Sequence, residues 1–166
     1  TIASTLTLFA GDTGIDQVVI GTGTKTSAIT TGTVALNINA SAVTNSLRLI
    51  GNNGPNTLSG TAYADILDGR SGIDSMNGGN GADIYIISTS AEHTTAEIAD
   101  SGVSGVDEIR FAATAASTLT LLAGDTGIEK MVIGVGSADT AITTGIAAIK
   151  IDAAAIGNSL TIVGNN

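Results

Sequence analysis

The stretch GRSGIDSMNGGNGADIYI, residues 69–86, contains one short pattern twice. Each nine-residue unit opens with glycine and places an aspartate sixth, at Asp74 and Asp83. A three-residue run with an apolar middle residue then follows, centred on Met76 and Tyr85. Glycine permits backbone angles that are closed to other residues, including positive φ. The spacing of nine therefore predicts one tight turn and one short strand in each unit.

The same spacing extends beyond this stretch. Four contiguous units fill residues 51–86, a fifth fits 102–110, and looser versions occur at 11–19 and 124–132. Side chains alternate between the two faces of a strand, so the middle residue of each run should point inward and its two neighbours outward. The predicted inward residues are Leu58, Leu67, Met76, Tyr85 and Ile109.

The chemistry of the turns points to a cation. A glycine-rich turn can direct several carbonyl oxygens at one point, and the sixth residue adds a carboxylate. Calcium takes six to eight oxygen ligands in a tolerant geometry. One turn cannot supply that number, but two stacked turns can. If only one such turn were present, its acid would indicate no more than a solvent-exposed turn. Four contiguous units in the same register favour calcium binding instead.

Residues 51–86 resemble the RTX nonapeptide repeat, G-G-x-G-x-D-x-U-x with U apolar, and GGNGADIYI at 78–86 is the nearest match. The resemblance implies an all-β fold, a right-handed parallel β-roll or β-helix in which calcium ions lie between turns two units apart. It also implies that turn 51–56 stacks on 69–74, and turn 60–65 on 78–83. Asn56 and Asp74 would then serve one column of sites, and Asp65 and Asp83 the other.

The full ligand set implied by the resemblance joins these side chains to carbonyls at the first and third positions of each turn, and adds the aspartate of the fifth unit. It comprises Gly51, Asn53, Asn56, Gly60, Ala62, Asp65, Gly69, Ser71, Asp74, Gly78, Asn80, Asp83 and Asp107. Asp16 and Glu129 are weaker candidates.

Three residues depart from the family pattern. Asn56 offers a neutral amide oxygen in place of a carboxylate. Tyr63 replaces the fourth glycine of its turn, which affects the geometry of the second column. Arg70 occupies a second-glycine position and would repel a cation if its side chain pointed inward.

The chain also repeats on a longer scale. Residues 1–53 return as 114–166 at an offset of 113, with 32 of the 53 aligned positions identical. We therefore divide the chain into an apolar, threonine-rich half-unit at 1–50, the calcium-binding block at 51–86, an acidic connector with a further β rung at 87–113, and a second half-unit at 114–166. We expect the coil to continue through 1–50 as β-solenoid; a small separate β-sandwich is the alternative. The pattern favours part of a longer tandem array over a single duplicated domain.

Composition limits the function. The net charge of −9 argues against nucleic acid as a partner, since phosphate binding needs clustered Lys and Arg. No apolar run reaches the length of a membrane span. Cysteine is absent, which excludes disulfides and thiolate metal sites. His93 is the single histidine and lies in a polar connector, so we expect no enzymatic activity. The threonine-rich runs are too irregularly spaced to favour an ice-binding solenoid.

The sequence thus indicates a calcium-dependent structural repeat of an extracellular bacterial protein: a surface layer, sheath, matrix fibre or adhesin stalk. The resemblance implies type I secretion of an unfolded chain that folds on meeting calcium outside the cell. Calcium ions and neighbouring repeats of the same protein are the expected partners. A calcium-folded C-terminal module of a secreted enzyme or toxin is the alternative, and an adhesin that binds a glycan or protein through 1–50 is a weaker one.

Overall fold

The computed structural model describes residues 3–24, 26–95, 97–137, 140–145 and 147–166. The regular elements of this part of the chain are all strands, and most of them pair in parallel. One sheet has the order β1 (Ser4–Thr7), β5 (Leu36–Asn39), β7 (Thr57–Ser59), β9 (Ser75–Asn77). The other has the order β15 (Thr161–Val163), β13 (Lys130–Ile133), β11 (Glu108–Phe111), β10 (Ile84–Ile87), β8 (Ile66–Asp68), β6 (Arg48–Ile50), β2 (Gln17–Val19).

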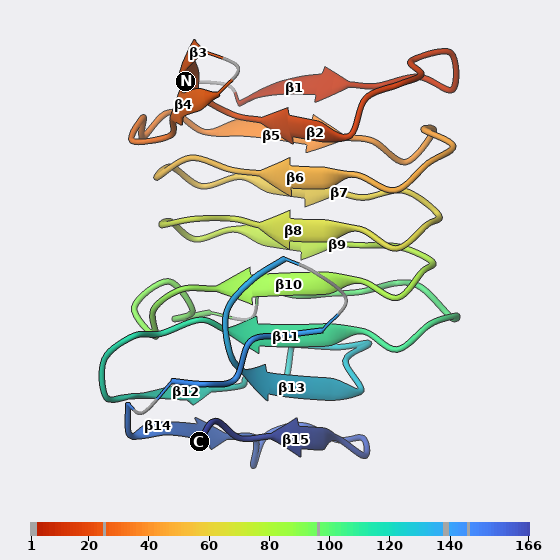
Figure 1. Cartoon of the computed structure of the whole chain (residues 1–166). Helices are drawn as coiled ribbons and strands as arrows, with labels where there is room; N and C mark the ends of the chain where they lie inside the picture. The colour runs from red at the N-terminus through yellow and green to blue at the C-terminus, as the bar shows by residue number, and fades with distance from the viewer. Residues whose placement is uncertain (1–2, 25, 96, 138–139, 146) are drawn as a thin grey trace.

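The chain descends from β1 to β15 and alternates between the two sheets from β5 to β10 (Figure 1). Two further two-stranded sheets are formed by β3 (Thr22–Thr24) with β4 (Ser27–Ile29) and by β12 (Ser117–Thr120) with β14 (Ile149–Asp152). Strands of the seven-stranded sheet point left at the front of the view, and those of the four-stranded sheet point right behind them. This is a right-handed parallel β-roll, as the sequence predicts. We call one strand from each sheet with its two turns a rung. The half-unit at 1–50 contributes rungs to the same two sheets, because β5 pairs with β7 and β6 with β8.

The register explains the spacing of nine. Leu58 pairs with Met76 and Leu67 with Tyr85, so strands that stack on one another are two units apart in sequence. Beyond the block the rungs lengthen: Tyr85 pairs with Ile109, and Ile109 with Met131.

A thin apolar core runs between the sheets. The five residues predicted to point inward are all buried, which confirms that part of the sequence analysis. Ile38, Leu49, Ile98 and Met131 continue the core above and below the calcium-binding block. Fully burying a side chain of this size contributes about 1.5–3 kcal/mol. Because the layer is only one side chain deep on each sheet, the stacking of rungs has to supply most of the contacts.

The outward side chains of the seven-stranded sheet differ from expectation. Residues on both sides of Ile109 point outward but are buried, and Arg110 is 0% exposed. Its guanidinium Nη1 donates to the carbonyl of Gly136 at 2.8 Å. Residues 134–137 and 140–142, which we call the 134–142 segment and in which Val135 and Ile142 pair antiparallel, therefore lie over this face (Figure 1). The strand period gives the direction of a side chain but not what covers it.

The two half-units share one design. In the first, β1 pairs with β5, and a hairpin of β3 (Thr22–Thr24) and β4 (Ser27–Ile29) follows β2. In the second, β12 (Ser117–Thr120) pairs with β14 (Ile149–Asp152), and the 134–142 segment takes the place of the hairpin.

Candidate metal centre

Turns 51–56 and 69–74 stack along one side of the roll. The N–H of Asn56 donates to Asp74 Oδ1 at 2.8 Å, and the N–H of Asn52 donates to Asn56 Oδ1 at 2.8 Å. The first-position glycines are in close backbone contact, because a Cβ on Gly51 would collide with the carbonyl oxygen of Gly69. Glycine at this position is therefore required by the approach of the next turn.

The other side of the roll carries a ladder of acids. Each acid at or near the sixth position accepts a hydrogen bond from the backbone N–H of the preceding rung. The four bonds are Leu47 N–H to Asp65 Oδ1 at 2.6 Å, Asp65 N–H to Asp83 Oδ1 at 2.7 Å, Asp83 N–H to Asp107 Oδ1 at 2.8 Å, and Asp107 N–H to Glu129 Oε2 at 2.9 Å. The ladder holds the carboxylates in one column and leaves each with a second oxygen for another partner.

The residues that depart from the family pattern are accommodated. The turn containing Tyr63 is closed by Thr61, whose N–H donates to Asp65 Oδ2 at 2.5 Å and whose hydroxyl accepts the Tyr63 N–H at 3.0 Å. Arg70 adopts a φ of 68°, which is unusual for a residue other than glycine. Its Nε lies 3.5 Å from Asp68 Oδ2, so the guanidinium is paired with a carboxylate on the outer face of β8.

The predicted ligands fall into two groups by burial. Residues at the first and sixth positions of the four turns are buried, whereas those at the third position, Asn53, Ala62, Ser71 and Asn80, are exposed. The buried set comprises Gly51, Asn56, Gly60, Asp65, Gly69, Asp74, Gly78 and Asp83. Turn 102–107, which carries Asp107, stacks on 78–83: the N–H of Gly81 donates to the carbonyl of Ser104 at 3.1 Å.

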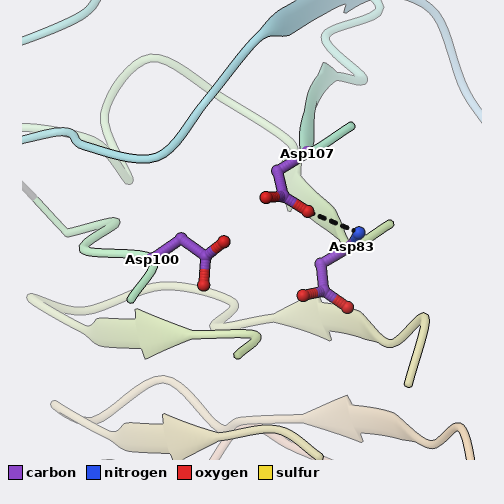
Figure 2. A group of neighbouring side chains, drawn as sticks. All are labelled: Asp83, Asp100 and Asp107. Carbon is purple, nitrogen blue, oxygen red and sulfur yellow. Dashed lines mark hydrogen bonds between the residues drawn. The ribbon is translucent and has the colours of Figure 1, made fainter. Parts of the chain in front are cut away.

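Three aspartates meet where these two turns stack (Figure 2). Asp83, Asp100 and Asp107 each offer an oxygen, and these oxygens all lie within 4.8 Å of one another. We call this group the acid cluster. All three residues are buried.

Asp100 enters the acid cluster from the connector. Its Oδ1 accepts the N–H of Gly79 at 2.9 Å and that of Gly102 at 3.3 Å. Among the residues that the structure describes, its buried Oδ2 has no hydrogen-bond partner, and neither has Oδ2 of Asp83. Unpaired buried carboxylate oxygens are costly unless a cation satisfies them. Two orphaned oxygens beside a third carboxylate therefore fit a hard cation that takes oxygen ligands, which is what calcium is.

The electrostatics agree with a missing positive charge. Burial raises the pKa of Asp83 to about 7, and the nearby Asp65 and Asp100 carboxylates add to the shift. Burial and then the adjacent Asp100 carboxyl raise the pKa of Asp107 to about 8. In the other column burial raises the pKa of Asp74 to about 7. A bound divalent cation opposes these shifts, because it favours the charged form of each carboxylate.

Asp100 is not among the residues predicted from the sequence. It lies in 87–113, predicted to be an acidic connector with a further β rung, yet Ile98 is fully buried and bridges Met76 as the next inward residue of its sheet. Asp100 follows the bridged residues Ile98 and Ala99 and lies two residues before Gly102. More residues therefore separate the extended segment from the first glycine of the turn than in the other units. The sequence EIAD at 97–100, an apolar residue between acids, could have predicted a further inward residue followed by a ligand.

A second buried charged group lies nearby. His93 Nε2 is 2.9 Å from Asp125 Oδ2, and its Nδ1 is 3.6 Å from Glu97 Oε2. Burial acts to lower the pKa of His93, but the hydrogen bonds to Asp125 and Glu97 outweigh it and raise the pKa to about 9. We call these three residues the junction cluster, because they join the connector to the second half-unit.

A family model described as the RTX calcium-binding nonapeptide repeat (4 copies) matches residues 50–85. The chain therefore contains a block of RTX nonapeptide repeats at residues 50–85. Such repeats bind calcium, and the match covers the four turns between 51 and 83 but not turn 102–107. RTX repeats are typical of secreted bacterial proteins. No curated protein and no solved structure matches the chain. Within the described residues, no helix is long and apolar enough to cross a membrane.

Proposed function

We propose that this RTX-repeat protein is a calcium-dependent structural repeat of an extracellular bacterial protein, such as a surface layer, sheath, matrix fibre or adhesin stalk. The observation that carries the proposal is the acid cluster, in which two buried carboxylate oxygens lack a partner. The unfolded chain has no such preformed site, so calcium binding stabilises the folded state.

The charge pattern supports folding after export. The chain has 15 acidic and six basic residues, and several of the acids lie in the two turn columns. Without calcium, stacked carboxylates repel one another or must take up protons. Low cytoplasmic calcium then keeps the chain unfolded for secretion, and millimolar calcium outside the cell folds it. The extended roll and the duplicated half-units suit a load-bearing or spacing role.

We also propose that the chain has no catalytic activity of its own. His93 is the single histidine, and both ring nitrogens face carboxylates inside the protein. The ring is buried, so it is not available to a substrate as an acid or base.

Circular dichroism tests the proposal. Calcium added to chelated protein should produce a sharp gain of β-signal, and magnesium should not. Asp83→Asn should shift the calcium midpoint upward, whereas Asp152→Asn should not, because Asp152 is exposed and its bond from Ala154 N–H is kept by an amide oxygen. A full β-signal in chelator, unchanged by calcium, would contradict calcium-coupled folding.

The neighbouring sequence of the parent gene separates the structural role from a calcium-folded module of a secreted enzyme or toxin. Further copies at 113-residue spacing support the structural array. A catalytic domain next to a single calcium block supports the module instead.

A further inference from the structure

The duplicated half-units share a pairing register but differ in exposure. Leu6 and Leu119 are equivalent in sequence, yet Leu6 is 52% exposed and Leu119 is 0% exposed. The pairing register is shared, since Ser4 pairs with Leu36 and Ser117 with Ile149 at the same separation. The difference in exposure therefore arises because another segment of the chain covers the second half-unit, whereas the corresponding face of the first half-unit is uncovered.

In the second half-unit, the cover is the connector and β11 of the preceding block. The N–H of Lys130 donates to the carbonyl of Asp107 at 3.0 Å, and the N–H of Gly134 donates to that of Phe111 at 3.0 Å. The carbonyl of Gly136 accepts Arg110 Nη1 at 2.8 Å. The connector adds His93, whose ring is bound by Asp125.

The first half-unit keeps the receiving groups. Asp12 corresponds to Asp125, Gly21 to Gly134, and Gly23 to Gly136, while Asp16 replaces Glu129 with another carboxylate. The backbone conformation is kept as well: φ is 101° at Gly23 and 96° at Gly136.

Three of these groups, Asp16, Gly21 and Gly23, line an open hollow of about 640 Å³ together with residues of β2 and of the β3–β4 hairpin. In Figure 1 the hairpin stands at the N-terminal end of the roll, while the equivalent 134–142 segment rises over β11. In the second half-unit, Arg110 and β11 occupy the position that corresponds to this hollow.

We propose that the N-terminal face, formed by β1, β2 and the β3–β4 hairpin, is a docking surface for residues 92–95 and 97–111 of a preceding unit in a tandem array, whose own β11 edge is free to receive it because the half-unit that follows that edge is residues 1–53. Arg110 of the incoming unit donates to the carbonyl of Gly23, its Phe111 carbonyl accepts the N–H of Gly21, and its His93 binds Asp12. Gln17 stands where Lys130 pairs with Glu108 at 2.9 Å, so this contact becomes a hydrogen bond. The proposal deepens the structural role by naming the contact between units, and it rests on the duplication and not on calcium.

A half-unit exchange tests the proposal at unchanged chain length. Residues 114–166 are replaced by a second copy of residues 1–53, which places the same sequence once at the free end and once against β11. Hydrogen exchange of peptides covering 14–24 should then show two mass envelopes of equal intensity, one slow and one fast. Arg110→Met in the exchanged chain should speed the slow envelope by about tenfold at the hairpin, since one hydrogen bond to a charged group is lost.

A single fast envelope would overturn the proposal, because the first half-unit would then fail to accept β11. A single slow envelope that persists on dilution would also overturn the proposal. It would mean that the copy at the free end is protected from exchange although no β11 lies against it. The calcium titration of the same chain is read separately: a normal calcium response with one fast envelope rejects the docking surface and leaves the calcium-dependent role intact.

Discussion

Asp100→Asn is expected to act in opposite directions on the calcium-free and calcium-bound protein. The substitution removes one charge from the acid cluster without removing a hydrogen-bond acceptor. Asn retains the oxygen that accepts the N–H groups of Gly79 and Gly102. Any change in stability therefore reports the charge and not the turn.

The magnitude follows from the geometry of the acid cluster. Two ionised carboxylates whose oxygens lie within 4.8 Å repel by on the order of 3 kcal/mol at an effective dielectric constant of 20. Asp83 and Asp107 have pKa values raised to about 7 and about 8, so both are largely ionised at pH 8.5. The calcium-free variant should then be more stable than the parent by roughly 1–3 kcal/mol at pH 8.5, and by much less at pH 5. With calcium the order reverses, because a ligand has lost its charge, and the calcium midpoint should rise about tenfold or more.

Folding induced by a stabilising osmolyte in chelator, at both pH values, and a calcium titration measure the two effects. Asp152→Asn is the control, since its carboxylate is exposed and distant in sequence from the acid cluster. A loss of stability in chelator at pH 8.5 would show that the Asp100 charge supports the fold directly. A calcium midpoint equal to that of the parent would remove Asp100 from the metal centre.

Three further predictions concern protons and buried groups. The raised pKa values of Asp74, Asp83 and Asp107 contribute stability below the ordinary value of 3.8, and this contribution is lost as pH rises through about 7 to 8. The residual β-signal of the chelated protein should therefore fall from pH 4 to pH 8.5, and a signal that does not change with pH would count against buried acids. His93 has a pKa raised from 6.5 to about 9, so its contribution is complete below pH 6.5 and disappears as pH rises through about 9. His93→Gln should cost about 3–5 kcal/mol at pH 7 by urea unfolding, and parental stability would show that the junction cluster is not a stabilising ion pair. Tyr85→Phe leaves the Gly78 N–H, which now donates to the Tyr85 hydroxyl at 2.7 Å, without that acceptor, and should cost about 1–3 kcal/mol by the same assay.

The nine-residue spacing was sufficient to predict the stacked strands of the block. Because each unit contains one turn and one strand, Leu58 has to stack on Met76 and Leu67 on Tyr85, as the register shows. The spacing did not predict the connector, where more residues separate Ile98 from the first glycine of the next turn. A nine-residue period cannot place residues where the segment between strands has a different length, and Asp100 lies in such a segment.

The burial of Arg110 shows a different limit of the sequence. Strand alternation places it outward, and an arginine on an outward face is normally solvated. Its partner Gly136 comes from the following half-unit, 26 residues further along the chain. Local patterning has no means to find such a contact. The duplicated sequence does contain a hint, since the glycine recurs as Gly23 with the same positive φ.

The ladder of acids links the calcium sites to the apolar half-unit. Glu129 accepts the N–H of Asp107, and Asp107 in turn accepts that of Asp83, so the second half-unit is bonded directly to the acid cluster. We expect calcium held by Asp83 and Asp107 to order the strand onto which β13 is added as well, because β11 pairs with β13 directly after Asp107. Calcium binding should then favour folding of the second half-unit, a segment that contributes none of the three carboxylates of the acid cluster.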